Sequence, residues 1–279
     1  MTIQALLRPL LAAAFALGLA LPLRAEDPAR IESVYQAIGL PALIEIMREE
    51  GIAYGAELEA ELFPGRGRAS WAAAVERVYG LERMQAAIRA GLAAELDDGE
   101  IDGIMAFFET EAGARIIGLE IAARRALLDK AVEEAAREAW AALEAEGGAR
   151  WELLIEFAEV NDLVESNVAG AMTSNYAFYM GLVDGGAFGM DMPEAQVLSD
   201  VWAQEPAIRE ETVDWVFSFT ALAYQPLSDA EFQAYVDFSA TPAGQALNNA
   251  IFAAFNPMFV EMSRQMGRDA AQFLAGRDL

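Results

Sequence analysis

The sequence predicts an all-α fold, a multi-helix bundle built from an internal duplication. Alanine, leucine, glutamate and arginine dominate, and these residues have high helix propensity. β-Branched residues are sparse and no alternating apolar run is longer than a few positions, so strand patterns are nearly missing. In addition, one segment of the first half recurs in the second half. These observations favour helices over any fold with a sheet.

The first 25 residues have the pattern of a cleavable signal peptide. Arg8 gives a short positive region, residues 9–21 are uncharged and rich in Leu and Ala, and Ala25 ends the segment with a small side chain. An uncleaved anchor helix is the alternative, but the run is shorter than the roughly 20 residues that a bilayer span requires. A lipoprotein would need a Cys, and the chain has none. We therefore expect a periplasmic protein with no transmembrane anchor after cleavage.

Charge and composition exclude several classes of function. Without Arg8 and Arg24, the 19 basic residues become 17 against 44 acidic ones, a net charge of −27. Such a field repels phosphate backbones, so we expect no nucleic-acid partner. The absence of His and Cys removes imidazole bases, thiol nucleophiles, disulfides and the usual zinc, haem and iron–sulfur ligands. We expect no metal and no cofactor, and a solvated position for Lys130, the only lysine.

Helix punctuation divides the first half of the mature chain. Pro41 is expected to open a helix that Gly51 closes, and residues 64–67 read as a loop. Ser70 is a candidate N-cap for the next helix. A long amphipathic helix is then predicted from residue 111 to residue 146, because apolar residues recur there at steps of three, four and seven.

Gly147 and Gly148 end that helix and give the best boundary between two halves, residues 26–148 and residues 149–279. In the second half, helices are predicted over residues 150–183 and 205–224. Between them, residues 184–193 form the longest glycine-rich loop of the chain.

The repeat relates residues 96–118 to residues 227–249 by a shift of 131 positions without a gap. Seven of the 23 positions are identical, where chance gives roughly one or two. The identical pairs are Leu96 and Leu227, Asp98 and Asp229, Glu100 and Glu231, Phe107 and Phe238, Thr110 and Thr241, Ala112 and Ala243, and Gly113 and Gly244.

Each of these identities has a structural interpretation. Residues 228–231 (Ser-Asp-Ala-Glu) and residues 97–100 (Asp-Asp-Gly-Glu) both read as capping boxes. Thr110 and Thr241 read as N-caps of the helices that follow, and Gly113 and Gly244 predict a close approach by another helix. Folding thus explains the repeat better than a shared catalytic role does.

The motif Leu-[Ser/Asp]-Asp-x-Glu followed by Phe-x-x-Thr-x-Ala-Gly resembles the family called domain of unknown function 2059, found as tandem copies in exported proteobacterial proteins. The second copy, with Pro242 after Thr241, resembles it more closely than the first, where Glu111 replaces Pro. The resemblance implies an all-α periplasmic protein. It implies no activity and no catalytic residues.

The best candidate for a binding surface lies around the glycine-rich loop. Aromatic and polar side chains flank a loop there and could bind an unknown protein or an apolar small molecule. The candidate ligand-binding residues are Tyr179, Asp184, Phe188, Trp202, Glu205 and Arg209. An ordinary aromatic core beside a turn, with Glu205 and Arg209 paired on the surface, is the alternative.

Two classes of function therefore stay open. The first is a non-enzymatic binding protein or scaffold of the cell envelope. The second is a carboxylate hydrolase of a cell-wall substrate, for which Glu32-Ser33 and Glu165-Ser166 match the Glu-Ser dipeptide of some such enzymes. A buried Glu with a raised pKa in an open cleft would favour the enzyme, and an apolar groove without one would favour the binder.

Overall fold

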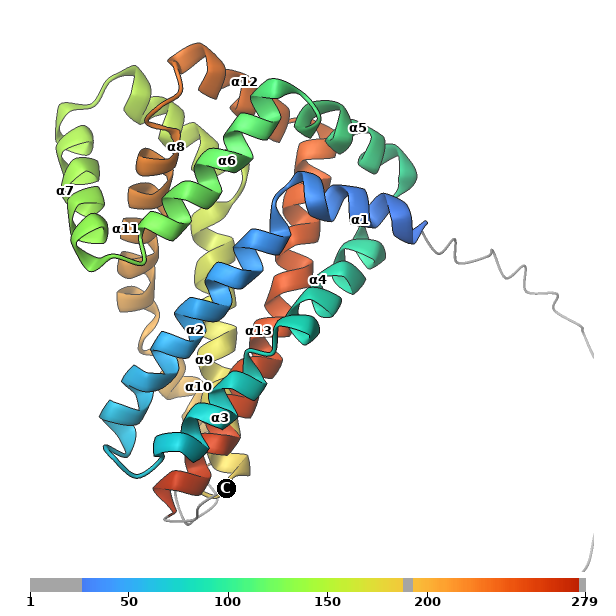
Figure 1. Cartoon of the computed structure of the whole chain (residues 1–279). Helices are drawn as coiled ribbons and strands as arrows, with labels where there is room; N and C mark the ends of the chain where they lie inside the picture. Colours follow the sequence, from blue (N-terminus) through green and yellow to red (C-terminus); the bar gives the residue numbers. More distant parts are fainter. Residues whose placement is uncertain (1–26, 188–192, 276–279) are drawn as a thin grey trace, which may run out of the picture.

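The computed structural model describes residues 27–187 and 193–275, and every regular element in these ranges is an α-helix (Figure 1). The prediction of an all-α fold is confirmed. The helices are α1 (Pro28–Ala37), α2 (Leu40–Leu62), α3 (Arg68–Val78), α4 (Leu81–Glu95), α5 (Asp98–Phe108), α6 (Glu111–Ala126), α7 (Lys130–Glu146), α8 (Ala149–Val160), α9 (Leu163–Asp184), α10 (Glu194–Trp202), α11 (Glu205–Tyr224), α12 (Asp229–Ser239) and α13 (Pro242–Leu274). The predicted signal peptide, residues 1–25, lies outside the described residues.

The long helix α13 runs through the molecule and packs most extensively against α9 (Figure 1). Glycines make this close approach possible. A Cβ on Gly181 of α9 would lie 2.2 Å from the carbonyl oxygen of Arg264, and one on Gly267 of α13 would lie 2.1 Å from that of Phe178. Any larger residue at either position would push the two backbones apart.

The described residues form two hydrophobic cores. The first is built mainly by α1–α5 around α13, with Phe63 stacked on Phe273 at 5.2 Å. The second is built by α6, α7, α8, α11 and α12, with Trp140 stacked on Phe217 at 4.5 Å. Because α13 belongs to the first core and α6 to the second, the two halves of the sequence are interleaved.

The repeated segments have the same local structure. Both predicted capping boxes are present, from Asp97 to Glu100 and from Ser228 to Glu231. The hydroxyl of Thr110 accepts a hydrogen bond from the Gly113 amide at 3.0 Å. The equivalent bond, from the Gly244 amide to the Thr241 hydroxyl, measures 3.1 Å.

The two glycines also lie in equivalent surroundings. A Cβ on Gly113 would lie 2.4 Å from the Phe107 carbonyl oxygen, and one on Gly244 would lie 2.2 Å from that of Phe238. The close approach predicted from sequence is therefore made by the last turn of the preceding helix, α5 or α12. The aromatic rings of Phe107 and Phe238 stack on each other with their centroids 4.1 Å apart. The two repeated segments therefore meet at these two residues.

Several predicted helix boundaries were wrong. Gly51 does not end a helix: α2 continues to Leu62, and Gly51 is required because a Cβ there would lie 2.0 Å from the ring of Tyr79. Ser70 is not an N-cap, because α3 begins at Arg68, after Gly67.

The two long helices predicted around the boundary are each broken. The segment 111–146 divides at residues 127–129, where the Asp129 carboxylate accepts a hydrogen bond from the Ala131 amide and caps α7. The segment 150–183 divides at residues 161 and 162, where Asp162 has a left-handed backbone with φ of 48°. The second break shapes the candidate site below.

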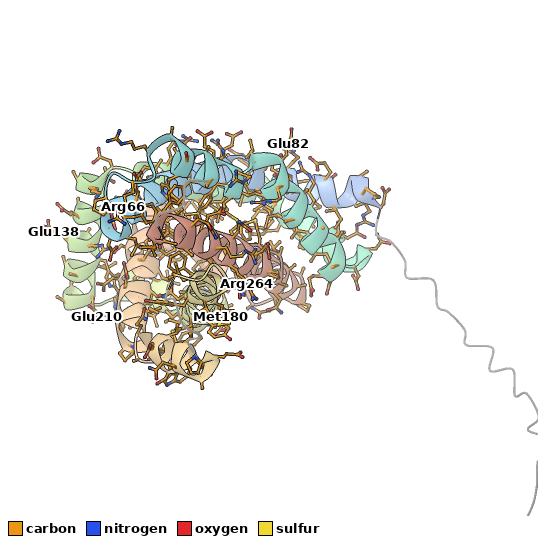
Figure 2. The ribbon with its side chains drawn as sticks, turned by 90° about the horizontal axis from the view of Figure 1, so that it is seen from below. Arg66, Glu82, Glu138, Met180, Glu210 and Arg264 are labelled. Atoms are coloured by element: carbon orange, nitrogen blue, oxygen red, sulfur yellow. The ribbon has the colours of Figure 1, made fainter. Side chains whose placement is uncertain are left out.

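Charged side chains cover the outside of the bundle, as Glu82 and Glu138 illustrate at its edge in Figure 2. Lys130 is exposed, with its Nζ 3.6 Å from Glu57. Within residues 27–187 and 193–275, no helix has both the length and the hydropathy needed to cross a bilayer.

Candidate functional site

A cavity of about 220 Å³ opens between α6, α8, α9, α11, α12 and α13. Most of its wall is aromatic and aliphatic, and a few amide and hydroxyl groups interrupt it. The aromatic lining residues are Phe157, Trp215, Phe219, Tyr224, Tyr235, Phe238 and Phe252, and the neutral polar ones are Asn161, Asn167, Thr220, Ser239 and Asn248. An apolar wall with a small number of convergent polar groups is the usual character of a small-molecule site.

In the part of the chain that the structure describes, Glu120 of α6 is the one carboxylate that lines this cavity, and no basic side chain lines it. Its Oε1 accepts hydrogen bonds from the hydroxyl groups of Tyr224 at 2.8 Å and Tyr235 at 3.1 Å. Burial raises the pKa of the Glu120 carboxyl, and the two tyrosine donors partly oppose that shift. Burial and the neighbouring carboxylate also raise the pKa of both tyrosines well above the ordinary value.

The floor of the cavity is fixed by the break between α8 and α9. The Asn161 side chain donates to the Phe157 carbonyl oxygen at 2.9 Å, and the Asn161 carbonyl accepts from Asn248 of α13 at 2.9 Å. Gln245 of α13 donates to the Val160 carbonyl oxygen at 2.8 Å. These bonds satisfy backbone groups that the broken helix leaves unpaired, which explains why the chain can turn here.

Two hollows of about 470 Å³ and 400 Å³ adjoin the cavity, and Asn167 and Trp215 line all three. The larger hollow is mostly apolar, with Arg124 at its wall. Arg124 forms a bidentate pair with Glu50 at 2.9 Å and 2.6 Å, and its guanidinium lies 4.7 Å from the ring centroid of Trp215. We call these three adjoining spaces the groove, and Glu120 lines only the first of them.

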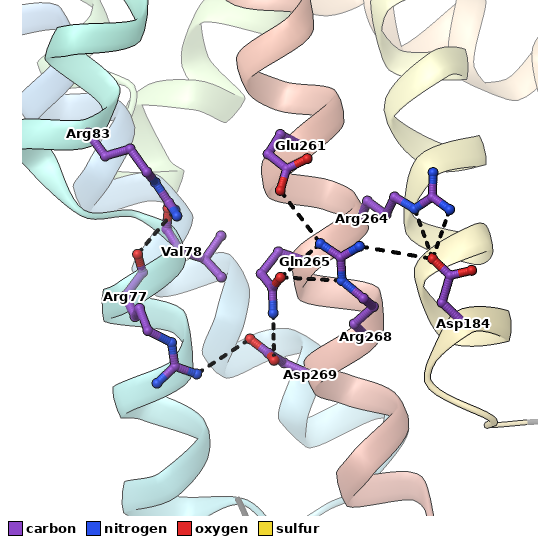
Figure 3. A network of polar contacts seen from close by, with 9 residues as sticks. All are labelled: Arg77, Val78, Arg83, Asp184, Glu261, Arg264, Gln265, Arg268 and Asp269. Atoms are coloured by element: carbon purple, nitrogen blue, oxygen red, sulfur yellow. Dashed lines mark hydrogen bonds and ion pairs between the residues drawn. The ribbon is translucent and has the colours of Figure 1, made fainter.

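The residues predicted from the glycine-rich loop lie elsewhere. Asp184 ends α9 and pairs with Arg264 at 2.8 Å and with Arg268 at 4.0 Å, in a polar network that links α9 to α13 (Figure 3). Tyr179 is half-buried against the first core, and Trp202 is 70% exposed.

Glu205 pairs with Arg209 at 2.7 Å, as the spacing predicted, and Arg209 also pairs with Glu165 at 2.5 Å. Phe188 lies outside the described residues. Of the five candidates that the structure describes, only Glu205 and Arg209 pair with each other, and none of the five lines the groove. Trp215, an aromatic residue that follows the loop in sequence, does line it.

The two Glu-Ser dipeptides have no catalytic geometry. Glu32 forms an ion pair with Arg89 at 2.6 Å, and this hydrogen bond lowers the pKa of the Glu32 carboxyl. The hydrogen bond from Arg209 likewise lowers the pKa of Glu165. A general acid needs the opposite shift, so neither residue is suited to that role.

Residues 82–141 match the model of a family described as "Uncharacterized protein conserved in bacteria (DUF2059)". This segment of the chain is similar to that family. The DUF2059 segment contains the first repeated motif and Glu120, whereas the sequence had suggested the second motif as the closer match. Tyr224, Tyr235 and Trp215 lie beyond it, so most of the cavity wall comes from outside the matched residues.

No curated protein and no solved structure matches the chain. The family is uncharacterised, so the match assigns no activity to Glu120. Reasoning from sequence missed this residue, although one signal was available. Under the shift of 131, Glu120 pairs with Ile251, so a carboxylate stands in one copy where the other has an apolar residue.

Proposed function

We propose that the protein is a non-enzymatic binding protein that holds a small, largely apolar molecule in the cavity around Glu120. The observation that carries the proposal is an aromatic cavity in which one described residue is a carboxylate, adjoined by a mostly apolar hollow. A cavity of roughly 150 Å³ suffices to hold benzene in a well-packed helical protein. The volume of about 220 Å³ therefore has room for a ligand or headgroup of that size.

A binding role agrees better with these groups than a scaffold role does. A scaffold needs an exposed surface and has no use for a hollow, which costs packing energy. Retaining this hollow beside a partly buried carboxylate is unfavourable for stability unless a ligand fills it.

Hydrolysis is the second candidate, because burial raises the pKa of Glu120 as a general acid requires. Most glycosidases place a second carboxylate on the opposite side of the bond. Among the residues that the structure describes, no second Asp or Glu lines the cavity; Glu133 and Glu211 line the adjoining hollow of about 400 Å³. The geometry therefore supports binding more strongly than cleavage.

We also propose that the protein acts in the periplasm. The support is the order of a positive region, an apolar run and a small residue in residues 1–25. Intact-mass measurement of the protein from its own host tests this, and retention of residues 1–25 would contradict it.

The binding proposal is tested by blocking the groove. Asn167 lines all three spaces and is half-buried on α9, so Asn167→Trp places an indole where the spaces meet. Thr173→Trp is the matched control, since Thr173 is exposed on the same helix and lines none of them. Each protein is purified from its host, and molecules that remain bound are identified by native mass spectrometry.

We expect a bound small molecule in the wild-type and Thr173→Trp proteins and its loss in Asn167→Trp, with similar unfolding midpoints for all three. Retention of the same molecule in Asn167→Trp would show that it binds elsewhere. For the hydrolase, wild-type protein and Glu120→Gln are incubated with purified peptidoglycan. Soluble fragments released by the wild-type protein and not by the variant would establish cleavage and contradict our proposal.

A further inference from the structure

The chemistry of the cavity also identifies a class of ligand, on the assumption that the cavity is a binding site. Glu120 brings a carboxyl group to a wall in which no described residue is basic. Both tyrosine hydroxyls donate to Oε1, and within the described part of the chain no hydrogen bond reaches Oε2. Glu120 is partly buried, a carboxylate in that position without a cationic partner is destabilising, and a bound cation would supply the missing partner.

The aromatic wall favours the same class. Trp215 and Phe219 stack with centroids 5.3 Å apart, and Tyr224 and Tyr235 lie beside the carboxylate. The faces of aromatic rings attract cations, and cages of such rings recognise quaternary ammonium groups. Arg124 already lies over the ring of Trp215, which shows that this wall accommodates a positive charge.

The two arginines that line the adjoining hollows, Arg124 and Arg137, are both paired with carboxylates. Arg124 stands one turn from Glu120 on α6, but its charge is neutralised by the bidentate pair with Glu50. The chain as a whole has a net charge of −25, so its field attracts cations and repels anions. An anionic ligand would meet both that field and Glu120 itself.

We propose that the cavity binds an organic ammonium cation, with the ammonium group beside Glu120 and its apolar part toward the hollow lined by Leu43, Met47 and Phe259. This assignment rests on the proposed binding function and narrows its ligand. A neutral ligand that accepts a hydrogen bond from Glu120 is the competing outcome.

The test uses two probes of the same shape. Choline carries a quaternary ammonium, and 3,3-dimethylbutan-1-ol replaces that nitrogen with carbon and is neutral. Binding of each to purified wild-type protein, Glu120→Gln and Glu138→Gln is measured by isothermal titration calorimetry. Gln keeps an oxygen that can accept from the tyrosines, and Glu138 is an exposed residue of α7 that controls for the loss of one negative charge.

We expect choline to bind the wild-type protein at least about tenfold more tightly than its neutral isostere, and Glu120→Gln to abolish that preference. Glu138→Gln should retain it. Equal binding of the two probes, or binding of neither, would overturn the cation assignment. Neither outcome tests the binding proposal, which the Asn167→Trp comparison decides. The cation assignment and the binding proposal can therefore fail separately.

Discussion

Two glycines of α6, five residues apart, should respond in opposite directions to the same substitution. A Cβ on Gly113 would lie 2.4 Å from the Phe107 carbonyl oxygen and 2.7 Å from the Phe108 Cα, both backbone atoms that cannot move without distorting the end of α5. A Cβ on Gly118 would have nothing within 4 Å. Both positions are helical, so the difference in contacts decides whether Ala raises or lowers the free energy of unfolding.

The expected changes in the free energy of unfolding follow from these contacts. Replacing a helical Gly by Ala reduces the entropy of the unfolded chain and stabilises a compatible site by about 0.4–1 kcal/mol. Gly118→Ala should show that gain. At Gly113 the same gain is offset by overpacking, which typically costs about 1–3 kcal/mol. Gly113→Ala should therefore lose about 1–2 kcal/mol net.

Urea unfolding of the mature protein, followed by circular dichroism, measures both values. Gly244→Ala belongs in the same series, because its Cβ would lie 2.2 Å from the Phe238 carbonyl oxygen, and it should lose about as much as Gly113→Ala. If Gly113→Ala were as stabilising as Gly118→Ala, the tight turn would not be the reason for glycine there. A loss at Gly113 without one at Gly244 would contradict the equivalence of the two turns.

Three further predictions concern single side chains. Ser228→Ala should cost about 1 kcal/mol in urea unfolding, because it removes the capping box with Glu231. Because burial raises the pKa of Glu120, the folded protein binds more protons than the unfolded chain above the ordinary glutamate pKa, and stability falls as pH rises through that window. Glu120→Gln should therefore be more stable than wild-type at neutral pH, and this gain should vanish below pH about 4; a pH-independent difference would contradict the shift. Trp202→Ala should change the free energy of unfolding by no more than about 0.5 kcal/mol, since the side chain is 70% exposed; a larger loss would place it in a contact absent from the described residues.

Local signals in the sequence predicted local structure well. The capping boxes at Asp97 and Ser228 and the helix from Glu205 to Tyr224 are confirmed, because each depends on residues within one or two turns. The missed boundaries depend on distant contacts. Gly51 looks like a helix stop. Glycine is needed there because the ring of Tyr79 packs against it, and the residues next to Gly51 in the sequence do not reveal that contact.

The candidate site shows the same limit more strongly. Its wall comes from six helices between Glu120 and Phe252, which are distant in sequence and meet only after packing. In the sequence, Tyr224 and Tyr235 look like ordinary core aromatics, and Glu120 looks like one acid among 44. We predicted a site at the glycine-rich loop because its sequence is unusual. The residues that line the cavity have no unusual sequence neighbours, so the sequence did not single them out.

The packing of the helices explains why such a cavity occurs on one side of the molecule. The order α1–α5 corresponds to α8–α12: α1 packs on α5 as α8 does on α12, and α2 packs on α4 as α9 does on α11. The helices that follow these two sets, α6 and α13, pack on the opposite set: α13 packs on α4, and α6 packs on α11, the counterpart of α4.

An internal duplication, predicted from the repeat, would account for this reciprocal arrangement. It would give two equivalent spaces, one under α4 and α13 and one under α11 and α6. The first is filled by Met84, Ile88 and Leu92, all fully buried in the first core. The second is left partly open, and its cavity is lined both by Glu120 and by Ile251, the residue that the shift of 131 pairs with Glu120. One space would then stabilise the fold while its counterpart binds a ligand, so we propose the function beside Glu120 and not in the motif that both segments share.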